Sequence, residues 1–240
     1  MPGSPSSCSI TGTSAPPPAS LASCSTSAAS TTTTVQSSRG PAGLTESTQI
    51  ASCCGARLSG GHVLAVAAGD PRIAAVVSQA PFTDAIPALL CVPPTNVVRL
   101  TVAGLWDQLC GWLGRPPHLA PAVGEPGTLA AMTAADAKPG FEGIVPSESL
   151  WRNEFAVRLM LRFPFYRPGL KAAQLNMPVL VCVCENDATT PPAPTVKAAE
   201  RAPRGELRSY PYGHFDIYND PKVKTDQVDF LRRVVTGVAA

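Results

Sequence analysis

The sequence predicts an α/β fold with a mostly parallel sheet flanked by helices. From residue 55 onward, short apolar runs typical of buried strands alternate with helix-like segments. Two of these runs, residues 178–184 and 206–210, each end in a polar loop, and a helix pattern over residues 223–235 closes the chain. A chain of 240 residues is long enough to bury the core of one such domain.

The first predicted unit is a helix followed by a strand. Residues 60–69 run from a Gly-Gly pair through Val, Leu and Ala to Gly69, and a glycine commonly ends a helix. After a turn at Asp70-Pro71, residues 73–78 form an apolar run suited to a strand buried on both faces. This alternation favours parallel rather than antiparallel strands.

A long, weakly periodic segment comes next. Residues 81–146 are rich in proline and glycine, which is typical of a cap-like insertion over an active site. Residues 147–163 are then interpreted as an amphipathic helix, with Ser147 as its N-cap.

The N-terminal part has a different composition. Residues 1–38 contain no charged side chain and consist largely of Ser, Thr, Ala and Pro. Such a segment has too little apolar surface to offset its chain entropy. We therefore expect residues 1–54 to be a low-complexity segment that is disordered or non-native, and residues 55–240 to form a partial α/β domain.

Composition excludes several classes of partner and cofactor. With 19 Lys+Arg against 17 Asp+Glu, the net charge is only +2, which gives no reason to expect nucleic acid or an anionic membrane. No apolar run reaches the roughly 18 residues of a membrane span, and no signal peptide follows Met1, so a cytoplasmic location is expected. The eight cysteines are then expected as free thiols, and they lack the spacing of a metal site. No cofactor is implied, and the oligomeric state is open.

Two candidate catalytic residues follow the two clearest strands. Asp187 lies three residues after the run 178–184, and His214 lies four residues after the run 206–210. Carboxyl ends of parallel strands meet at one edge of a sheet, where catalytic groups gather. Glu185 is a rival acid, but it lies closer to the strand, and Asp216 is interpreted as a surface residue.

These motifs resemble a known superfamily. The strand leading to Asp187, the turn Tyr212-Gly213-His214-Phe215 and the helix opening at Ser59-Gly60-Gly61-His62 are similar to α/β-hydrolases of the serine aminopeptidase-like and dienelactone hydrolase-like kinds, over about residues 55–238. The resemblance implies hydrolysis of a small-molecule ester or amide by a Ser-Asp-His triad. It also implies a G-x-S-x-G elbow that carries the serine.

The nucleophile position does not hold a serine. The elbow reads Gly55-Ala56-Arg57-Leu58-Ser59, so its register puts Arg57 at the nucleophile position. A guanidinium stays protonated and cannot attack a carbonyl carbon. Ser59 is a second candidate nucleophile, although it better fits the small residue that follows the nucleophile. We therefore predict a hydrolase-family chain that is inactive; the alternatives are a catalytically dead binding or scaffold protein and a non-functional gene product.

A shift of reading frame is a hypothesis that explains the unusual N-terminal part. If serine codons are TCN, reading one nucleotide earlier makes each one an N-T-N triplet, which encodes an apolar residue. Residues 6–14 then permit V-L-V-F-D-Y-R-H-F-G, and residues 47–57 permit V-D-P-D-R-V-V-L-W-G-T-S, a buried strand with the missing serine. Stop codons or polar sequence in that frame of the coding DNA upstream of Ser59 would exclude the hypothesis.

Overall fold

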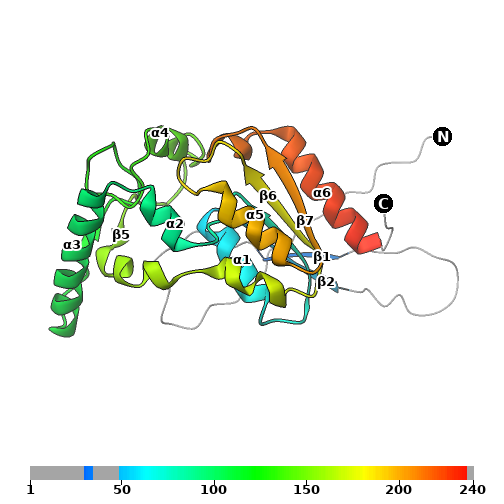
Figure 1. Ribbon diagram of the computed structural model, residues 1–240, viewed down its shortest axis with the longest axis horizontal. Coiled ribbons are helices and arrows are strands. Elements are labelled where there is room, and N and C mark those ends of the chain that lie inside the picture. Colours follow the sequence, from blue (N-terminus) through cyan, green and yellow to red (C-terminus); the bar gives the residue numbers. More distant parts are fainter. Residues whose placement is uncertain (1–29, 35–48, 237–240) are drawn as a thin grey trace, which may run out of the picture.

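The computed structural model describes residues 30–34 and 49–236, and its centre is a five-stranded sheet in the order β1-β2-β3-β6-β7 (Figure 1). The strands are β1 (Ser30–Thr34), β2 (Gln49–Ala56), β3 (Ile73–Gln79), β6 (Val179–Cys184) and β7 (Gly205–Tyr210). The last four run parallel, and β1 pairs antiparallel with β2 at one edge. The predicted α/β fold with a mostly parallel sheet is confirmed.

Helices cover both faces of this sheet. One apolar cluster joins α1 (Leu58–Ala67) and α5 (Pro192–Arg201) to β3 and β6. A second cluster on the opposite face joins α6 (Pro221–Thr236) to β3, β6 and β7. Because the sheet is covered on both sides, its central strands can be almost wholly apolar, and all six residues of β6 are buried.

Most predicted elements of the sheet and its helices are present. The helix over 60–69, the strands over 73–78, 178–184 and 206–210, and the closing helix correspond to α1, β3, β6, β7 and α6. Helix α5 was not predicted, because Pro192 and Pro194 are more typical of a loop. Proline nevertheless suits the first turn of a helix, where its missing N–H has no partner to lose.

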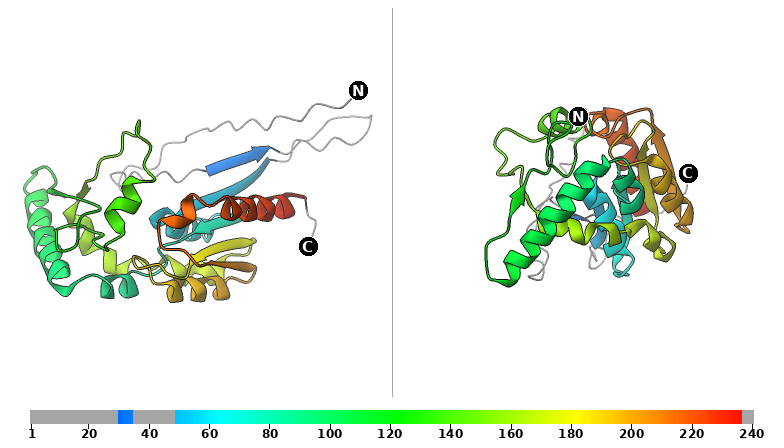
Figure 2. Two further views of the ribbon diagram at one scale, coloured as in Figure 1. Left: turned by 90° about the horizontal axis from the view of Figure 1, so that it is seen from above. Right: turned by 60° about the vertical axis from the view of Figure 1, so that its left-hand side comes forward.

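The segment between β3 and β6 holds the cap-like region. Figure 2 shows its longest helix, α3, at the end of the molecule far from the sheet. The elements of the segment are α2 (Ala85–Leu90), α3 (Pro94–Trp112), β4 (Leu119–Ala120), α4 (Ala137–Glu142), β5 (Phe155–Ala156) and the 3-10 helices Val157–Leu161, Phe163–Phe165 and Pro168–Gln174. No helix in the described residues is long and apolar enough to cross a membrane.

The predicted amphipathic helix over residues 147–163 is wrong. The chain there is a loop, followed by β5, which pairs with β4, and then by short 3-10 turns. Asn153 accounts for the difference: its side chain accepts a hydrogen bond from Val123 N–H at 2.9 Å and donates one to the Val123 carbonyl at 2.8 Å. This pair holds the chain in an extended form beside residues 119–123, and Ser147 caps no helix.

One buried ion pair attaches α3 to the 3-10 helix Val157–Leu161. Asp107 is fully buried, and its carboxylate accepts hydrogen bonds from the Arg158 guanidinium at 2.7 and 2.8 Å. The backbone N–H groups of His118 and Arg158 add two more. The Arg158 side chain, and then these N–H groups, hold the pKa of Asp107 well below its ordinary value despite burial.

This lowered pKa predicts a pH-dependent contribution of Asp107 to stability. The contribution is fully present above the unfolded pKa of about 3.9 and is lost as the pH falls below it. Asp107→Ala should therefore lower the free energy of unfolding by about 3 kcal/mol near neutral pH. Urea titrations followed by tryptophan fluorescence measure the free energy of unfolding of both chains. The difference in this free energy between variant and unmodified chain should be smaller at pH 3 than at neutral pH. A difference that does not change with pH would contradict the prediction.

A close approach of β2 and α1 shapes the turn between them. Strand β2 begins at Gln49, so the sheet reaches further toward the N-terminus than residue 55, where the sequence analysis starts the domain. Residues 1–29 and 35–48, which carry most of the predicted low-complexity segment, lie outside the described residues.

Gly55 lies where β2 and α1 come closest. A Cβ at Gly55 would overlap the Ser59 carbonyl and lie 2.8 Å from Val63 Cγ1, so only glycine fits there.

The Gly55 contact can be tested by adding one methyl group. Gly55→Ala should push β2 and α1 apart and destabilise the fold by about 2–3 kcal/mol. Gly69→Ala is the matched control, because a Cβ there meets only the Val66 carbonyl oxygen at 3.7 Å. Thermal unfolding should separate the two variants clearly, and equal midpoints would show that the approach is looser than described.

Candidate functional site

The turn between β2 and α1 holds Arg57 in an unusual backbone conformation. Arg57 lies between the strand and the helix with φ 55° and ψ −126°, in the left-handed half of the map that only glycine enters freely. Its N–H donates to the Gln79 carbonyl at 3.0 Å, and its own carbonyl accepts from Phe82 N–H at 2.9 Å. The surrounding backbone thus holds residue 57 in this conformation, at the carboxyl end of the sheet.

Asp187 and His214 lie together at the same end of the sheet. Asp187 follows β6 and His214 follows β7, and His214 Nδ1 is 2.6 Å from Asp187 Oδ2. The other Asp187 oxygen accepts from the N–H groups of Thr189 at 2.9 Å and Thr190 at 2.6 Å. Both side chains are buried, with 2% and 3% of their surface exposed. The structure therefore brings together the two residues that the sequence analysis selected as base and acid.

The side chain of Arg57 lies in an aromatic cluster beside this pair. Its guanidinium carbon is 4.3 Å from the ring centre of Phe141, 5.2 Å from that of Tyr218 and 5.9 Å from that of Phe215, the neighbour of His214. Such contacts stabilise a cation over a ring face. Burial lowers the pKa of the guanidinium, while Tyr218 opposes that shift. Among the described residues, Arg57 Nη1 and the Tyr218 hydroxyl are buried without a hydrogen-bond partner.

Ser59 and His62 occupy the first turns of α1. Ser59 is 3% exposed and stands two residues after the strained position, as expected for the small residue of an elbow. His62 Nδ1 is hydrogen-bonded to the Tyr166 hydroxyl, and burial lowers the pKa of the imidazole. The catalytic role of Ser59 stays a prediction, as do those of Asp187 and His214.

The two other acids considered for the site lie at the surface. The Glu185 side chain is exposed, and its backbone N–H continues the pairing with β7 by donating to the Tyr210 carbonyl at 2.9 Å. The exposed Asp216 accepts from Gly213 N–H at 3.0 Å and so supports the turn that carries His214. The carboxylate partner of the His214 imidazole is Asp187.

Sequence reasoning missed the residues that surround the site. Thr190 has a local signal, since an aspartate two or three residues before a threonine commonly accepts its backbone N–H in a turn. Phe141 and Tyr218 have no such signal, because they reach Arg57 from α4 and from the 3-10 helix Asp216–Tyr218. Phe141 belongs to the segment between β3 and β6, and Tyr218 to the turn after β7, so both contacts depend on tertiary packing.

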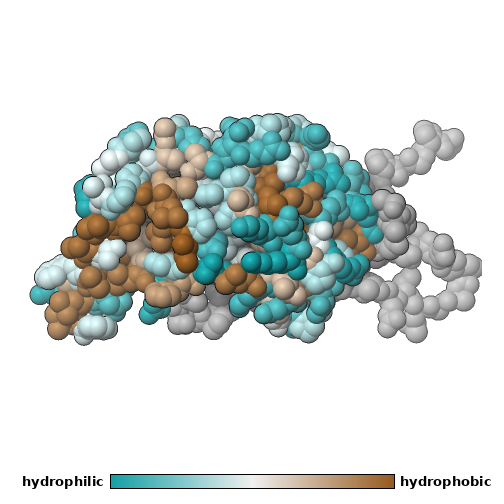
Figure 3. Space-filling model, viewed as in Figure 1, coloured by the Kyte–Doolittle hydropathy of each residue, from teal (hydrophilic) through white to brown (hydrophobic). Residues whose placement is uncertain are grey.

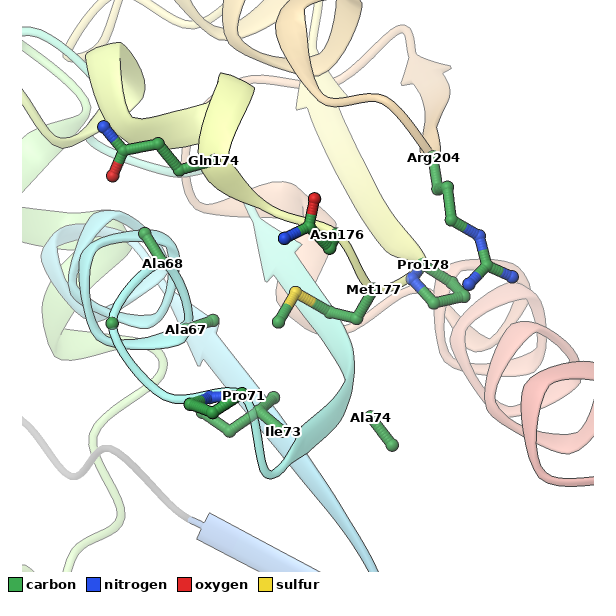
Figure 4. A pocket seen from close by; sticks show the side chains of 11 residues that line it. Ala67, Ala68, Pro71, Ile73, Ala74, Gln174, Asn176, Met177, Pro178 and Arg204 are labelled. Carbon is green, nitrogen blue, oxygen red and sulfur yellow. The ribbon is translucent and has the colours of Figure 1, made fainter.

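A cavity elsewhere in the structure does not belong to this site. It has a volume of about 400 Å³ and is lined by apolar residues together with Gln174, Asn176 and Arg204 (Figure 4). Ile73, Pro178 and Arg204 on its wall precede or begin β3, β6 and β7, so the cavity lies at the amino ends of the strands. The Asp187–His214 pair is at the opposite, carboxyl end.

Comparison with known proteins identifies the fold. No family model matches the chain. The curated quorum-quenching protein AidA of Acinetobacter baumannii (strain MDR-ZJ06) is 39% identical over 184 residues, covering 75% of this chain and 60% of the relative. The chain thus spans less than two thirds of that relative's length.

Solved structures agree with this likeness. The α/β hydrolase GrgF from Penicillium sp. sh18 superposes with a TM-score of 0.61 at 23% identity, over 75% of this chain and 62% of its own. DcsB, in complex with its substrate analogue, superposes with a TM-score of 0.62 at 19% identity, over 76% of this chain and 64% of DcsB. A monoacylglycerol lipase from Paleococcus ferrophilus superposes with a TM-score of 0.51 at 20% identity, over 76% of this chain and 67% of the lipase. Together with the sheet order, these likenesses show that the chain is an α/β-hydrolase by fold.

Proposed function

We propose that this chain carries the acid and the base of an ester- or amide-hydrolysing triad, and that Arg57 at the nucleophile position prevents turnover. One observation carries the proposal: a residue with the strained backbone of a nucleophile elbow lies between β2 and α1, and its side chain is an arginine. The buried Asp187–His214 hydrogen bond supports it, since this pair is the remaining part of a triad.

In the proposed mechanism each group has one step. The Nδ1–H group of His214 donates a hydrogen bond to the Asp187 carboxylate. In this tautomer the other ring nitrogen, Nε2, can take a proton from a nucleophile. The resulting imidazolium is stabilised by the carboxylate and then gives its proton to the leaving alcohol or amine. A hydroxyl at residue 57 would supply the nucleophile, whereas a guanidinium has no lone pair available for attack.

The substrate class rests on family likeness. Relatives of this fold include an α/β hydrolase and a monoacylglycerol lipase. The name of the 39% identical relative assigns quorum quenching to that protein. For this chain we propose only a small-molecule ester or amide as the substrate of the scaffold.

Replacing the arginine tests the proposal directly. Arg57→Ser should create a nucleophile in the strained elbow, so that a fluorophosphonate probe labels the variant covalently but leaves the unmodified chain unlabelled. Adding His214→Ala to the Arg57→Ser chain should slow labelling by at least about 100-fold, because the base is lost. Intact-protein mass spectrometry measures the adduct, and peptide mapping locates it.

Two results would contradict the proposal. Labelling of the unmodified chain that disappears in Ser59→Ala would assign the nucleophile to Ser59. A folded Arg57→Ser variant that resists labelling would mean that residue 57 is not the nucleophile position. Circular dichroism and thermal unfolding establish that each variant is folded.

The orienting role of Asp187 gives a second prediction. In the Arg57→Ser chain, Asp187→Asn should lower the labelling rate by about 1,000-fold or more, because an amide that donates to Nδ1 favours the wrong tautomer. The matched control is Asp229→Asn, on a carboxylate that is 53% exposed and pairs with the exposed Arg232 on the same helix. This control should label at the rate of its parent, and similar rates for both variants would remove Asp187 from the mechanism.

A further inference from the structure

Helix α3 has two unlike faces, and only one of them packs on the protein. The inner face carries Asn96, Leu100, Gly104 and Asp107, which are buried. Asn96 Nδ2 donates to the Ala130 carbonyl at 3.0 Å, and Asp107 binds Arg158, so this face is firmly attached. The opposite face points away from the other described elements.

The outward face is a continuous apolar stripe. Its side chains are 47% to 77% exposed and are Val98, Val102, Leu105, Trp106, Leu109, Trp112 and Leu113. We call this set the α3 stripe. Figure 3 shows hydrophobic surface gathered at the end of the molecule that α3 occupies. Monomeric proteins rarely expose large continuous patches, and two half-exposed tryptophans are costly in water.

The spacing of the stripe favours a helix as its partner. Residues 98, 102, 105, 109 and 112 recur at alternating intervals of four and three, which is the a/d spacing of paired helices. With two tryptophans among its seven members, the stripe exposes on the order of 800 Å² of apolar surface. A standard stable interface buries about 800 Å² on each partner, so this area is sufficient for a dimer.

We propose that the α3 stripe mediates a two-fold symmetric dimer of this chain, in which α3 packs antiparallel against the α3 of a second copy. The size of the side chains along the stripe supports this arrangement. A valine stands at its amino end and Trp112 near its carboxyl end, so antiparallel packing places a large residue against a small one at each end. A two-fold axis beside Leu105 pairs each Val98 with Trp112 of the other copy.

A groove beside α3 provides the matching hollow. It has a volume of about 470 Å³ and is lined largely by apolar side chains, including Val98, Val102 and Trp106. This groove lies along the amino-terminal half of α3, where the antiparallel arrangement delivers Trp112 of the second copy. A tryptophan that fills an apolar hollow is a common anchor of protein interfaces.

The charges near the stripe are compatible with self-association. No member of the stripe is charged, and Asp107 points inward to Arg158. Arg99 borders the groove and donates to the Gly127 carbonyl at 3.2 Å. The antiparallel arrangement brings Arg99 near the carboxyl end of the opposite α3, where the helix dipole favours a cation.

The experiment measures oligomeric state by sedimentation velocity over a range of protein concentrations. The full chain should form dimers, and Leu105→Glu should weaken them by roughly 100-fold because the two-fold axis places both glutamates together. Leu105→Lys should do the same, and an equimolar mixture of the two variants should restore a heterodimer. Leu150→Glu is the control, since Leu150 is 97% exposed outside the stripe and its replacement should leave the dimer intact.

A second mixture tests the antiparallel direction. Val98→Glu and Trp112→Lys should each weaken the dimer, and their mixture should recover it, because residue 98 of one copy faces residue 112 of the other. If the mixture of the two Leu105 variants forms a dimer but the mixture of Val98→Glu and Trp112→Lys does not, the antiparallel arrangement is overturned. A full chain that stays monomeric at all concentrations would overturn the proposed dimer. If that monomer also sediments with phosphatidylcholine vesicles, and Leu105→Glu abolishes this, the stripe binds membranes instead.

Discussion

The turn between β2 and α1 leaves no room for a side chain at residue 55, and the candidate site depends on that constraint. Because Gly55 lets the helix approach the strand, the chain reverses over very few residues and Arg57 takes a positive φ. Its backbone bonds to Gln79 and Phe82 tie the turn to the end of β3. Pairing of β3 with β6, and of β6 with β7, then places Asp187 and His214 at the same edge.

The arginine in this turn is held by compensating contacts. A strained conformation of this kind costs on the order of 1–3 kcal/mol and persists only where the surrounding structure determines it. Three aromatic rings stabilise the guanidinium, yet one of its nitrogens is buried without a partner among the described residues. The backbone of the turn thus holds an arginine in a conformation that glycine enters more easily.

The cap-like region follows a similar principle, in which one buried polar contact positions a larger apolar element. The Asp107–Arg158 pair fixes the orientation of α3. With Asn96 and Asp107 directed inward, the helix turns the seven residues of the α3 stripe outward. The exposed stripe is therefore a consequence of how α3 is attached, and only a partner outside the described residues can cover it.

The sequence by itself predicted the strands β3, β6 and β7, the helices α1 and α6, and the places of Asp187 after β6 and His214 after β7. These depend on local apolar patterns and on residues a few positions apart. Only the tertiary structure decided that residues 147–163 are not a helix, that α3 and α5 are helices, and that Phe141 and Tyr218 enclose Arg57. Those features depend on contacts such as Asn153 with Val123, which join distant parts of the chain and outweigh local propensity.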